Sequence, residues 1–210
     1  MTDVSAPPTG GDLPLRGITV LITGAARETG RNAARVLSAL GANLHLSDNN
    51  ETALIDAART FHENAQGGIK LHVADVGERV DVEALAMDCE DADVLLHLAG
   101  DFPDKGADDL ESNEAEKRAW NRRVFGAENL TAEMDPETTG KKRILFLLSL
   151  FPKTDAVRPR MADAALAALA EQLNAAGGAI TAEAKNFDDA DAIAARICVW
   201  AEPSPDQAGG

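Results

Sequence analysis

The sequence predicts a doubly wound α/β fold, with one parallel sheet of six strands and helices on both of its faces. Strand-like and helix-like segments alternate along almost the whole chain, as a parallel sheet requires. The longest apolar run, residues 144–151, suits a central strand that is buried on both faces. A length of 210 residues suffices for one domain with a substantial core, which we expect over residues 13–200.

The composition is that of a globular protein with an acidic excess. Hydrophobic residues make up 45% of the chain, and 35 acidic against 20 basic side chains give a net charge of −15. This charge disfavours nucleic acid and anionic membranes as partners. The acidic excess can serve solubility or be an adaptation to a high-salt cytoplasm, and the sequence does not decide between the two. No apolar run is long enough to span a bilayer, and no basic segment with an apolar core opens the chain.

The two cysteines, Cys89 and Cys198, lack metal-ligand spacing and a secretory context. We therefore expect structural thiols in a reducing, cytoplasmic compartment, and no metal site. Residues 1–12 are rich in proline, glycine and small polar side chains, which predicts a disordered lead-in. Residues 201–210 predict a flexible tail.

The first unit is a strand, a turn and a helix. Residues 18–23 are mostly β-branched or aliphatic, and residues 32–42 carry apolar side chains at helical spacing. The turn between them reads TGAARETG over residues 23–30. Such a turn directs free backbone N–H groups at one spot, where the helix dipole also favours negative charge. The unit therefore predicts a site for a pyrophosphate.

The second strand, residues 42–47, ends at Asp48, which follows Gly30 by 18 residues. A carboxylate near this distance typically accepts hydrogen bonds from the ribose hydroxyls of a dinucleotide, and it would repel the 2′-phosphate of NADP. The position favours NAD. The alternative is that residues 48–50 form a simple polar turn.

The next two strands also end in residues that suit a dinucleotide site. Asp75 and Val76 follow the third strand, and Ala99 and Gly100 follow the fourth. Small residues at the end of a strand let a flat ring or a backbone approach closely. The helices expected here cover residues 51–64 and 80–89, and the strands cover residues 69–74 and 93–98.

The second half of the chain repeats the alternation of helix and strand. An acidic stretch precedes a long helix with an apolar stripe, and an alanine-rich helix follows Pro159. The expected helices cover residues 113–134, 161–176 and 188–200, and the strands cover residues 144–151 and 179–184.

Together these segments resemble the short-chain dehydrogenase/reductase family over roughly residues 15–200. The similar segments are TGAARETG, LHLSD, Asp75-Val76, HLAG, RVFGAENL and ILFLLSLF, in the family's order. The resemblance implies a Rossmann fold that binds NAD or, less favourably here, NADP. The cofactor-binding residues that it implies are Gly24, Arg27, Thr29, Gly30, Asp48, Asp75, Val76, Ala99 and Gly100.

The family's reaction uses a tyrosine, a lysine four residues later, a serine and an asparagine. This chain contains no tyrosine, and the resemblance places Met161 and Ala165 at the tyrosine and lysine positions. Arg123 stands where the asparagine is expected, and only Ser149 is retained. The family's usual proton donor is therefore absent.

Two further departures concern the cofactor and the substrate. Glu28 replaces the middle glycine of the turn, and its carboxylate would weaken pyrophosphate binding unless it points away or pairs with Arg27. The family's mobile substrate lid and last strand are missing or reduced, because the sixth strand runs almost directly into the last helix.

These observations give three functional hypotheses. The first is a non-catalytic or regulatory subunit that still holds NAD and pairs with itself or with an active family member, through helices 113–134 and 161–176. The second is an NAD-dependent oxidoreductase, or a lyase, isomerase or cyclase, that uses His97 or Ser149 as the catalytic residue. The third is a nucleotide or redox sensor.

Overall fold

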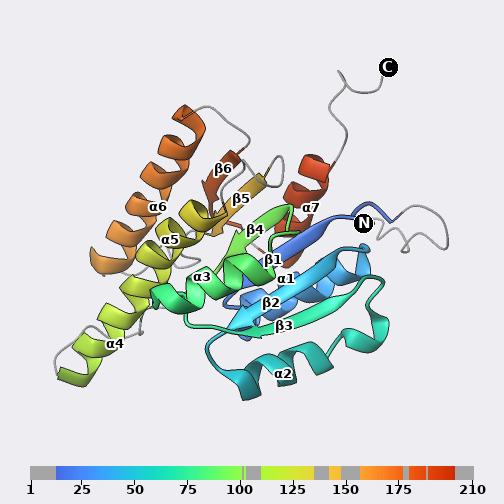
Figure 1. Ribbon diagram of the computed structural model, residues 1–210, viewed down its shortest axis with the longest axis horizontal. Helices are drawn as coiled ribbons and strands as arrows, with labels where there is room; N and C mark the ends of the chain where they lie inside the picture. Colours follow the sequence, from blue (N-terminus) through green and yellow to red (C-terminus); the bar gives the residue numbers. More distant parts are fainter. Residues whose placement is uncertain are drawn as a thin grey trace, which may run out of the picture.

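A computed structural model describes residues 13–100, 102, 110–134, 142–147, 157–176, 180–187 and 189–201. The lead-in expected at residues 1–12, Ser149, and all but the first residue of the expected tail lie outside this range. Among the described residues, six parallel strands form one sheet in the order β3-β2-β1-β4-β5-β6. This confirms the doubly wound α/β fold (Figure 1).

The strands lie close to where the sequence predicted them, although residues 148–151 of the predicted fifth strand lie outside the described residues. They are β1 (Thr19–Thr23), β2 (Asn43–Asp48), β3 (Ile69–Val73), β4 (Val94–His97), β5 (Lys142–Leu147) and β6 (Ile180–Lys185). The helices between them are α1 (Glu28–Ala39), α2 (Glu51–Arg59), α3 (Arg79–Asp88), α4 (Leu110–Trp120), α5 (Gly126–Glu133), α6 (Val157–Ala175) and α7 (Ala190–Ala201).

Two helices differ from the prediction in their inner structure. The helix expected over residues 51–64 ends at Arg59, and a short 3-10 turn, η1 (His62–Asn64), follows it. The helix expected over residues 113–134 is interrupted by one π-helical turn, η2 (Asn121–Phe125), between α4 and α5. Such a turn inserts an extra residue into the helix and is frequently found at functional sites.

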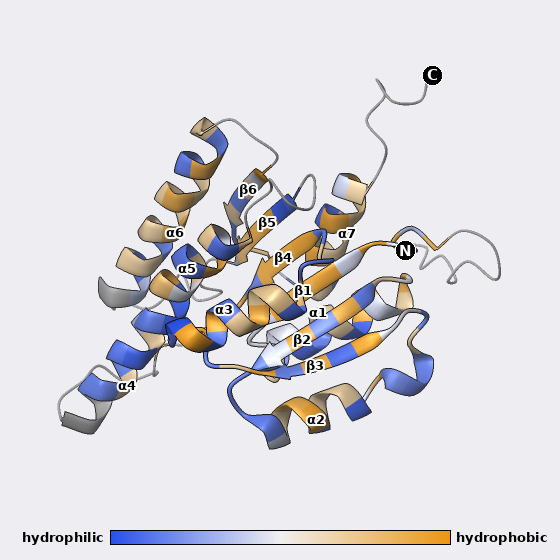
Figure 2. Ribbon diagram, in the orientation of Figure 1, coloured by the Kyte–Doolittle hydropathy of each residue, from blue (hydrophilic) through white to orange (hydrophobic). Residues whose placement is uncertain are grey.

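Apolar side chains alternate along β1, so the strand supplies both faces of the sheet. Val20 and Ile22 pack into one core with α1, α2 and α7, whereas Leu21 packs into a second core with α3, α5 and α6. Figure 2 shows the hydrophobic residues concentrated on β1 and β4, and α4 largely hydrophilic. None of the described helices combines the length and the apolar character needed to cross a membrane.

The order of the strands reverses at β1, because β2 and β3 lie on one side of it and β4 to β6 on the other. In open α/β sheets, ligands bind at the carboxyl ends of the strands next to this switch point. The residues that end β1, β2 and β4 therefore define the candidate site.

Candidate functional site

The turn after β1 is held tightly against the end of β4. Gly24 adopts a φ of 72°, and a Cβ there would lie 3.0 Å from the backbone of Leu98 and Ala99. Gly30 packs against the turn itself, since a Cβ there would lie 2.4 Å from the carbonyl oxygen of Gly24. Both glycines thus allow the close backbone approach that keeps the turn tight.

The first turn of α1 opens at this point. Arg27 occupies the N-cap position, and its side chain makes no capping hydrogen bond. The N–H groups of a first helical turn have no partner within the helix and can bind an anion. Arg27 and Glu28 are exposed, Thr29 is half-buried and Gly30 is buried.

Asp48, at the end of β2, braces the same turn. One carboxylate oxygen accepts the N–H of Ala26 at 3.2 Å, and the other accepts the N–H of Asn50 at 3.1 Å. The side chain is buried apart from 8% of its surface. A carboxylate has about four lone-pair sites, so two remain for other donors. Asp48 thus forms part of the polar turn that was one of the two interpretations of residues 48–50, and it can also accept hydrogen bonds from hydroxyl groups.

Asp75, after β3, is held by Arg122 from the π-helical turn. The guanidinium donates two hydrogen bonds to the carboxylate, from Nε at 2.8 Å and from Nη2 at 2.5 Å. These bonds hold the pKa of Asp75 below its ordinary value, and the N–H of Gly77 adds to the effect. Val76 is buried, and its carbonyl lies close to Gly126 on α5.

The end of β4 packs against the same helical segment. Ala99 is buried, and Gly100 adopts a φ of 92°, where a Cβ would lie within 2.6 Å of Ala119 and Arg123. The chain can approach the helix this closely only without a side chain at residue 100.

His97 is bonded at both ring nitrogens. Nδ1 lies 2.9 Å from the hydroxyl of Thr23, and Nε2 lies 3.1 Å from the carbonyl oxygen of Arg123. Burial, followed by the charge of Arg123, lowers the pKa of His97 to about 4. The imidazole is therefore neutral at pH 7 and ties β1 and β4 to the π-helical turn. This geometry fits packing better than proton transfer.

The sequence model of the short chain dehydrogenase family matches residues 18–154. The chain belongs to this family. A curated relative, dehydrogenase/reductase SDR family member 7B from Bos taurus, is 30% identical over an alignment of 131 residues, and the match covers 58% of this chain and 40% of the relative. The chain thus spans less than half of that relative's length.

Solved short-chain dehydrogenases share the fold. A citronellol catabolism dehydrogenase from Pseudomonas aeruginosa superposes with a TM-score of 0.74 at 18% identity, covering 97% of this chain and 94% of that one. A metagenomic short-chain oxidoreductase in complex with NADP gives 0.71 at 21% identity, covering 91% and 93%. Both superpositions show that the fold is shared.

The resemblance to the family places Met161, Ala165 and Arg123 at the positions of its tyrosine, lysine and asparagine. Met161 and Ala165 lie on α6, and Met161 is 54% exposed. Arg123 is buried on the π-helical turn, and its Nη2 donates to Asp163 of α6 at 3.0 Å. Ser149 belongs to the part of the chain that the structure leaves undescribed, so its role stays a prediction.

Two features escaped the sequence analysis. Arg122 carried no signal, because its partner Asp75 lies 47 residues earlier and only the tertiary structure pairs them. The side chains of His45, His72 and Cys89 also converge. Their separations of 27 and 17 residues match no short metal-binding spacing, and the expectation of no metal site rested on such spacing alone.

Proposed function

We propose that this chain holds NAD in the family's dinucleotide site without carrying out the family's hydride transfer, and acts as a non-catalytic or regulatory subunit. One observation carries the proposal: the 210 residues include no tyrosine. Hydride transfer between a carbonyl and an alcohol needs an acid or base at the substrate oxygen. Met161 and Ala165 at the corresponding positions offer neither a proton nor an ammonium group.

The bonds around the former catalytic positions support this proposal. Arg123 is engaged with Asp163, and its carbonyl bonds to His97. These contacts join β4, the π-helical turn and α6 by polar bonds that are buried at His97 and partly buried at Asp163. Hydrogen bonds of this kind hold the segments of the fold together. A buried imidazole with a pKa of about 4 is also a poor proton carrier at pH 7.

Retention of the dinucleotide site supports NAD as the ligand. Gly24 and Gly30 keep the tight turn, and Asp48 keeps lone pairs for the ribose hydroxyls. The carboxylate would repel a 2′-phosphate, although the metagenomic relative is complexed with NADP. The resemblance implies that Asp75 and Val76 contact the adenine, and both carboxylate oxygens of Asp75 accept hydrogen bonds from Arg122.

Pairing with a second chain is the other half of the proposal. Phe125 on the π-helical turn and Met161 on α6 are 49% and 54% exposed, and both lie in the helical segments through which the family commonly dimerises. Burying such side chains would stabilise an interface. The proposed location is the cytoplasm, as expected from the sequence.

Thermal unfolding with NAD, NADH, NADP and NADPH tests the ligand. At a concentration one hundred times the dissociation constant, a ligand should stabilise the fold by about 2.7 kcal/mol. We expect the largest shift from NAD or NADH. No shift with any of the four would contradict cofactor binding.

Turnover and assembly test the subunit role. The purified chain should neither oxidise alcohols nor reduce carbonyl compounds with the cofactor that stabilises it. Activity at ordinary enzyme rates would show the proposal to be wrong and would favour an enzyme that uses His97 or Ser149. Light scattering after size-exclusion chromatography should show a dimer, or a complex with an active family member. A monomer under both conditions would contradict the pairing.

A further inference from the structure

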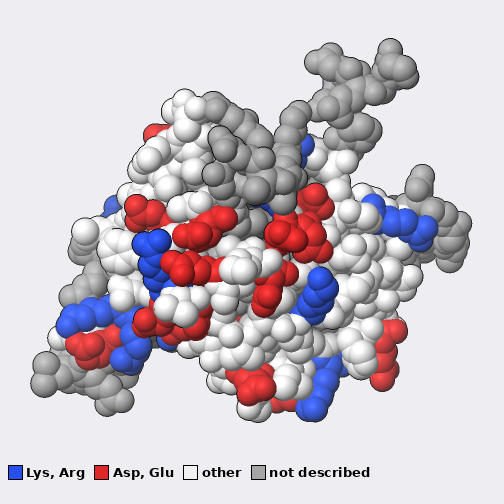
Figure 3. Space-filling model, in the orientation of Figure 1, with Lys and Arg blue, Asp and Glu red and all other residues white. Residues whose placement is uncertain are grey.

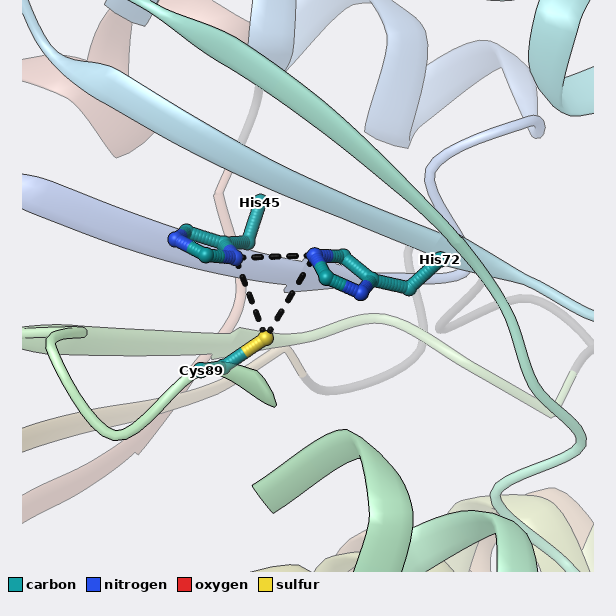
Figure 4. Close-up of side chains that lie close together, drawn as sticks. All are labelled: His45, His72 and Cys89. Atoms are coloured by element: carbon teal, nitrogen blue, oxygen red, sulfur yellow. Dashed lines mark hydrogen bonds between the residues drawn. The ribbon is translucent and has the colours of Figure 1, made fainter. Parts of the chain in front are cut away.

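Three potential metal ligands converge on the α3 side of the sheet, away from the dinucleotide site. His45 lies on β2, His72 on β3, and Cys89 directly follows α3 (Figure 4). Nδ1 of His45 lies 2.8 Å from Nε2 of His72, and the sulfur of Cys89 lies 3.2 Å and 3.7 Å from these two nitrogens. In Figure 4 the three atoms point toward one another.

The outer nitrogens of both rings face carboxylates. Nε2 of His45 lies 3.1 Å from Asp91, and Nδ1 of His72 lies 3.7 Å from Asp88. A carboxylate accepts hydrogen bonds, so these neighbours favour tautomers that carry the proton on the outer nitrogen. The inner nitrogens then present lone pairs to each other, and the thiol of Cys89 has one proton for two acceptors. A cation among the three atoms resolves this conflict.

The same arrangement is typical of metal sites in proteins. Histidine ligands usually donate their second N–H to a carboxylate, which fixes the ring and makes the ligating nitrogen more basic. Two imidazoles and one thiolate form a ligand set that zinc prefers. Tetrahedral zinc, with Zn–N of about 2.05 Å and Zn–S of about 2.3 Å, separates its ligand atoms by about 3.3 Å for two nitrogens and about 3.6 Å for nitrogen and sulfur. The observed distances differ from these by about 0.5 Å for the two nitrogens and by about 0.4 Å and 0.1 Å for the two nitrogen–sulfur pairs.

The surroundings also favour a cation. Residues 88–93 read DCEDAD, so four acidic residues lie within four positions of Cys89 along the chain. Figure 3 shows acidic side chains gathered over this side of the molecule. The exposed Lys70 lies 3.9 Å from Asp91 and offsets part of this charge. His45 and Cys89 are almost fully buried, whereas 13% of the His72 side chain is exposed, so His72 is the ligand nearest to solvent.

We propose that His45, His72 and Cys89 bind one zinc ion, with water as the fourth ligand. The ion connects the edge strand β3 to its neighbour β2 and to the end of α3. His45 and His72 each lie three residues before an acid of the dinucleotide site, Asp48 and Asp75. Zinc therefore fixes the strands that carry those acids, without touching the cofactor.

Metal binding to the full chain, freed of any purification tag and of bound metal, is the first test. We expect one equivalent of zinc to bind, in competition with a chromophoric chelator, and to raise the melting temperature. Cobalt should bind in its place and give the visible bands of a tetrahedral ion together with thiolate-to-cobalt charge transfer in the near ultraviolet. Failure to bind one equivalent of zinc would overturn the proposal and leave a hydrogen-bonded cluster.

Substitutions locate the ion. Cys89→Ser should abolish the charge-transfer band, whereas Cys198→Ser, which changes the other cysteine, should keep it. His72→Gln should weaken zinc binding at least tenfold, and His62→Gln, on an exposed turn, should not. Because His72 is partly exposed on the edge strand, its variant tests the site even if Cys89→Ser does not fold. Unchanged zinc affinity in His72→Gln would overturn the proposal.

The carboxylate behind His45 offers an independent test. Asp91→Asn should weaken zinc binding by about 10- to 100-fold, because it replaces the charged acceptor that orients the His45 ring with a neutral, weaker one. Asp56→Asn changes an exposed acid on α2 that bonds to Arg59, and it should have no effect. Equal zinc affinities for the two variants would contradict the assigned role of Asp91.

Discussion

Gly30→Ala tests whether the turn and α1 are packed as tightly as the structure shows. The added Cβ would lie 2.4 Å from the carbonyl oxygen of Gly24 and 2.8 Å from the Cα of Ala25. Both contacts are with backbone atoms, which cannot rotate away as a side chain can. The turn that forms the expected pyrophosphate site must therefore move.

Two opposing effects determine how much Gly30→Ala changes the free energy of unfolding. Alanine in place of glycine within a helix stabilises by about 0.5–1 kcal/mol. Overpacking costs about 1–3 kcal/mol, and we expect the upper part of this range because the clash is with backbone. The net loss is then about 1–2 kcal/mol, which lowers the melting temperature by about 2–8 °C in a domain of this size.

Thermal unfolding with and without NAD measures both consequences. Gly30→Ala should unfold at a lower temperature than the natural chain and should lose most of the stabilisation by NAD. Gly68→Ala is the matched control, because the nearest atom to its Cβ would be the side-chain oxygen of Asn43 at 3.5 Å, an ordinary contact. A melting temperature of Gly30→Ala equal to or above that of the natural chain would refute the argument.

Three further predictions concern charged and titrating side chains. Asp48→Ala removes the acceptor for the N–H of Ala26 and should lower the free energy of unfolding, measured in denaturant titrations, by about 1–3 kcal/mol. The variant should also lose part of the preference for NAD over NADP. An unchanged preference would contradict the role of Asp48 in binding the ribose. Because burial lowers the pKa of His97 from 6.5 to about 4, the unfolded chain binds more protons between these values, so stability should fall as the pH drops from about 6.5 to about 4. In His97→Asn the free energy of unfolding should depend less on pH over this range than in His62→Asn. Equal pH dependence in the two variants would contradict a lowered pKa for His97. Hydrogen bonds from Arg196, then from Lys185, lower the pKa of Glu183 to about 2, so its stabilisation is complete above pH 4.5 and is lost as the pH falls toward 2. Arg196→Met should show a smaller acid-induced fall in melting temperature over this range, and a fall as large as that of the natural chain would argue against the ion pair.

Much of the fold followed from local patterns. The six strands, the turn after β1 and the residues that end β2, β3 and β4 were predicted, because strand and helix periodicity and glycine-bearing turns act over a few neighbouring residues. The start of α6 at Val157, four residues before the predicted start, and the end of α2 at Arg59 show the usual uncertainty at helix ends. The π-helical turn was not predicted, since a single inserted residue shifts the apolar spacing at one point only and has no residue pattern of its own.

The candidate site was predicted only as a set of positions. The sequence placed Asp48, Asp75 and His97 at the ends of neighbouring strands, but it could not show what their side chains contact. Asp48 braces the turn through Ala26, and Asp75 pairs with Arg122. His97 bonds to the hydroxyl of Thr23 and to a helix carbonyl. Each partner lies more than twenty residues away along the chain, so the packing of the sheet decides it.

The sequence by itself determined the family, the class of fold and the absence of the family's tyrosine, because these depend on residue identity and local order. Only the tertiary structure decided which polar groups meet. The parallel register sets Ser47 of β2 beside His72 of β3, which brings His72 next to His45 on the same face of the sheet. The end of α3 then places Cys89 against both rings. Register and helix packing act between distant segments, and no local spacing in the sequence records them.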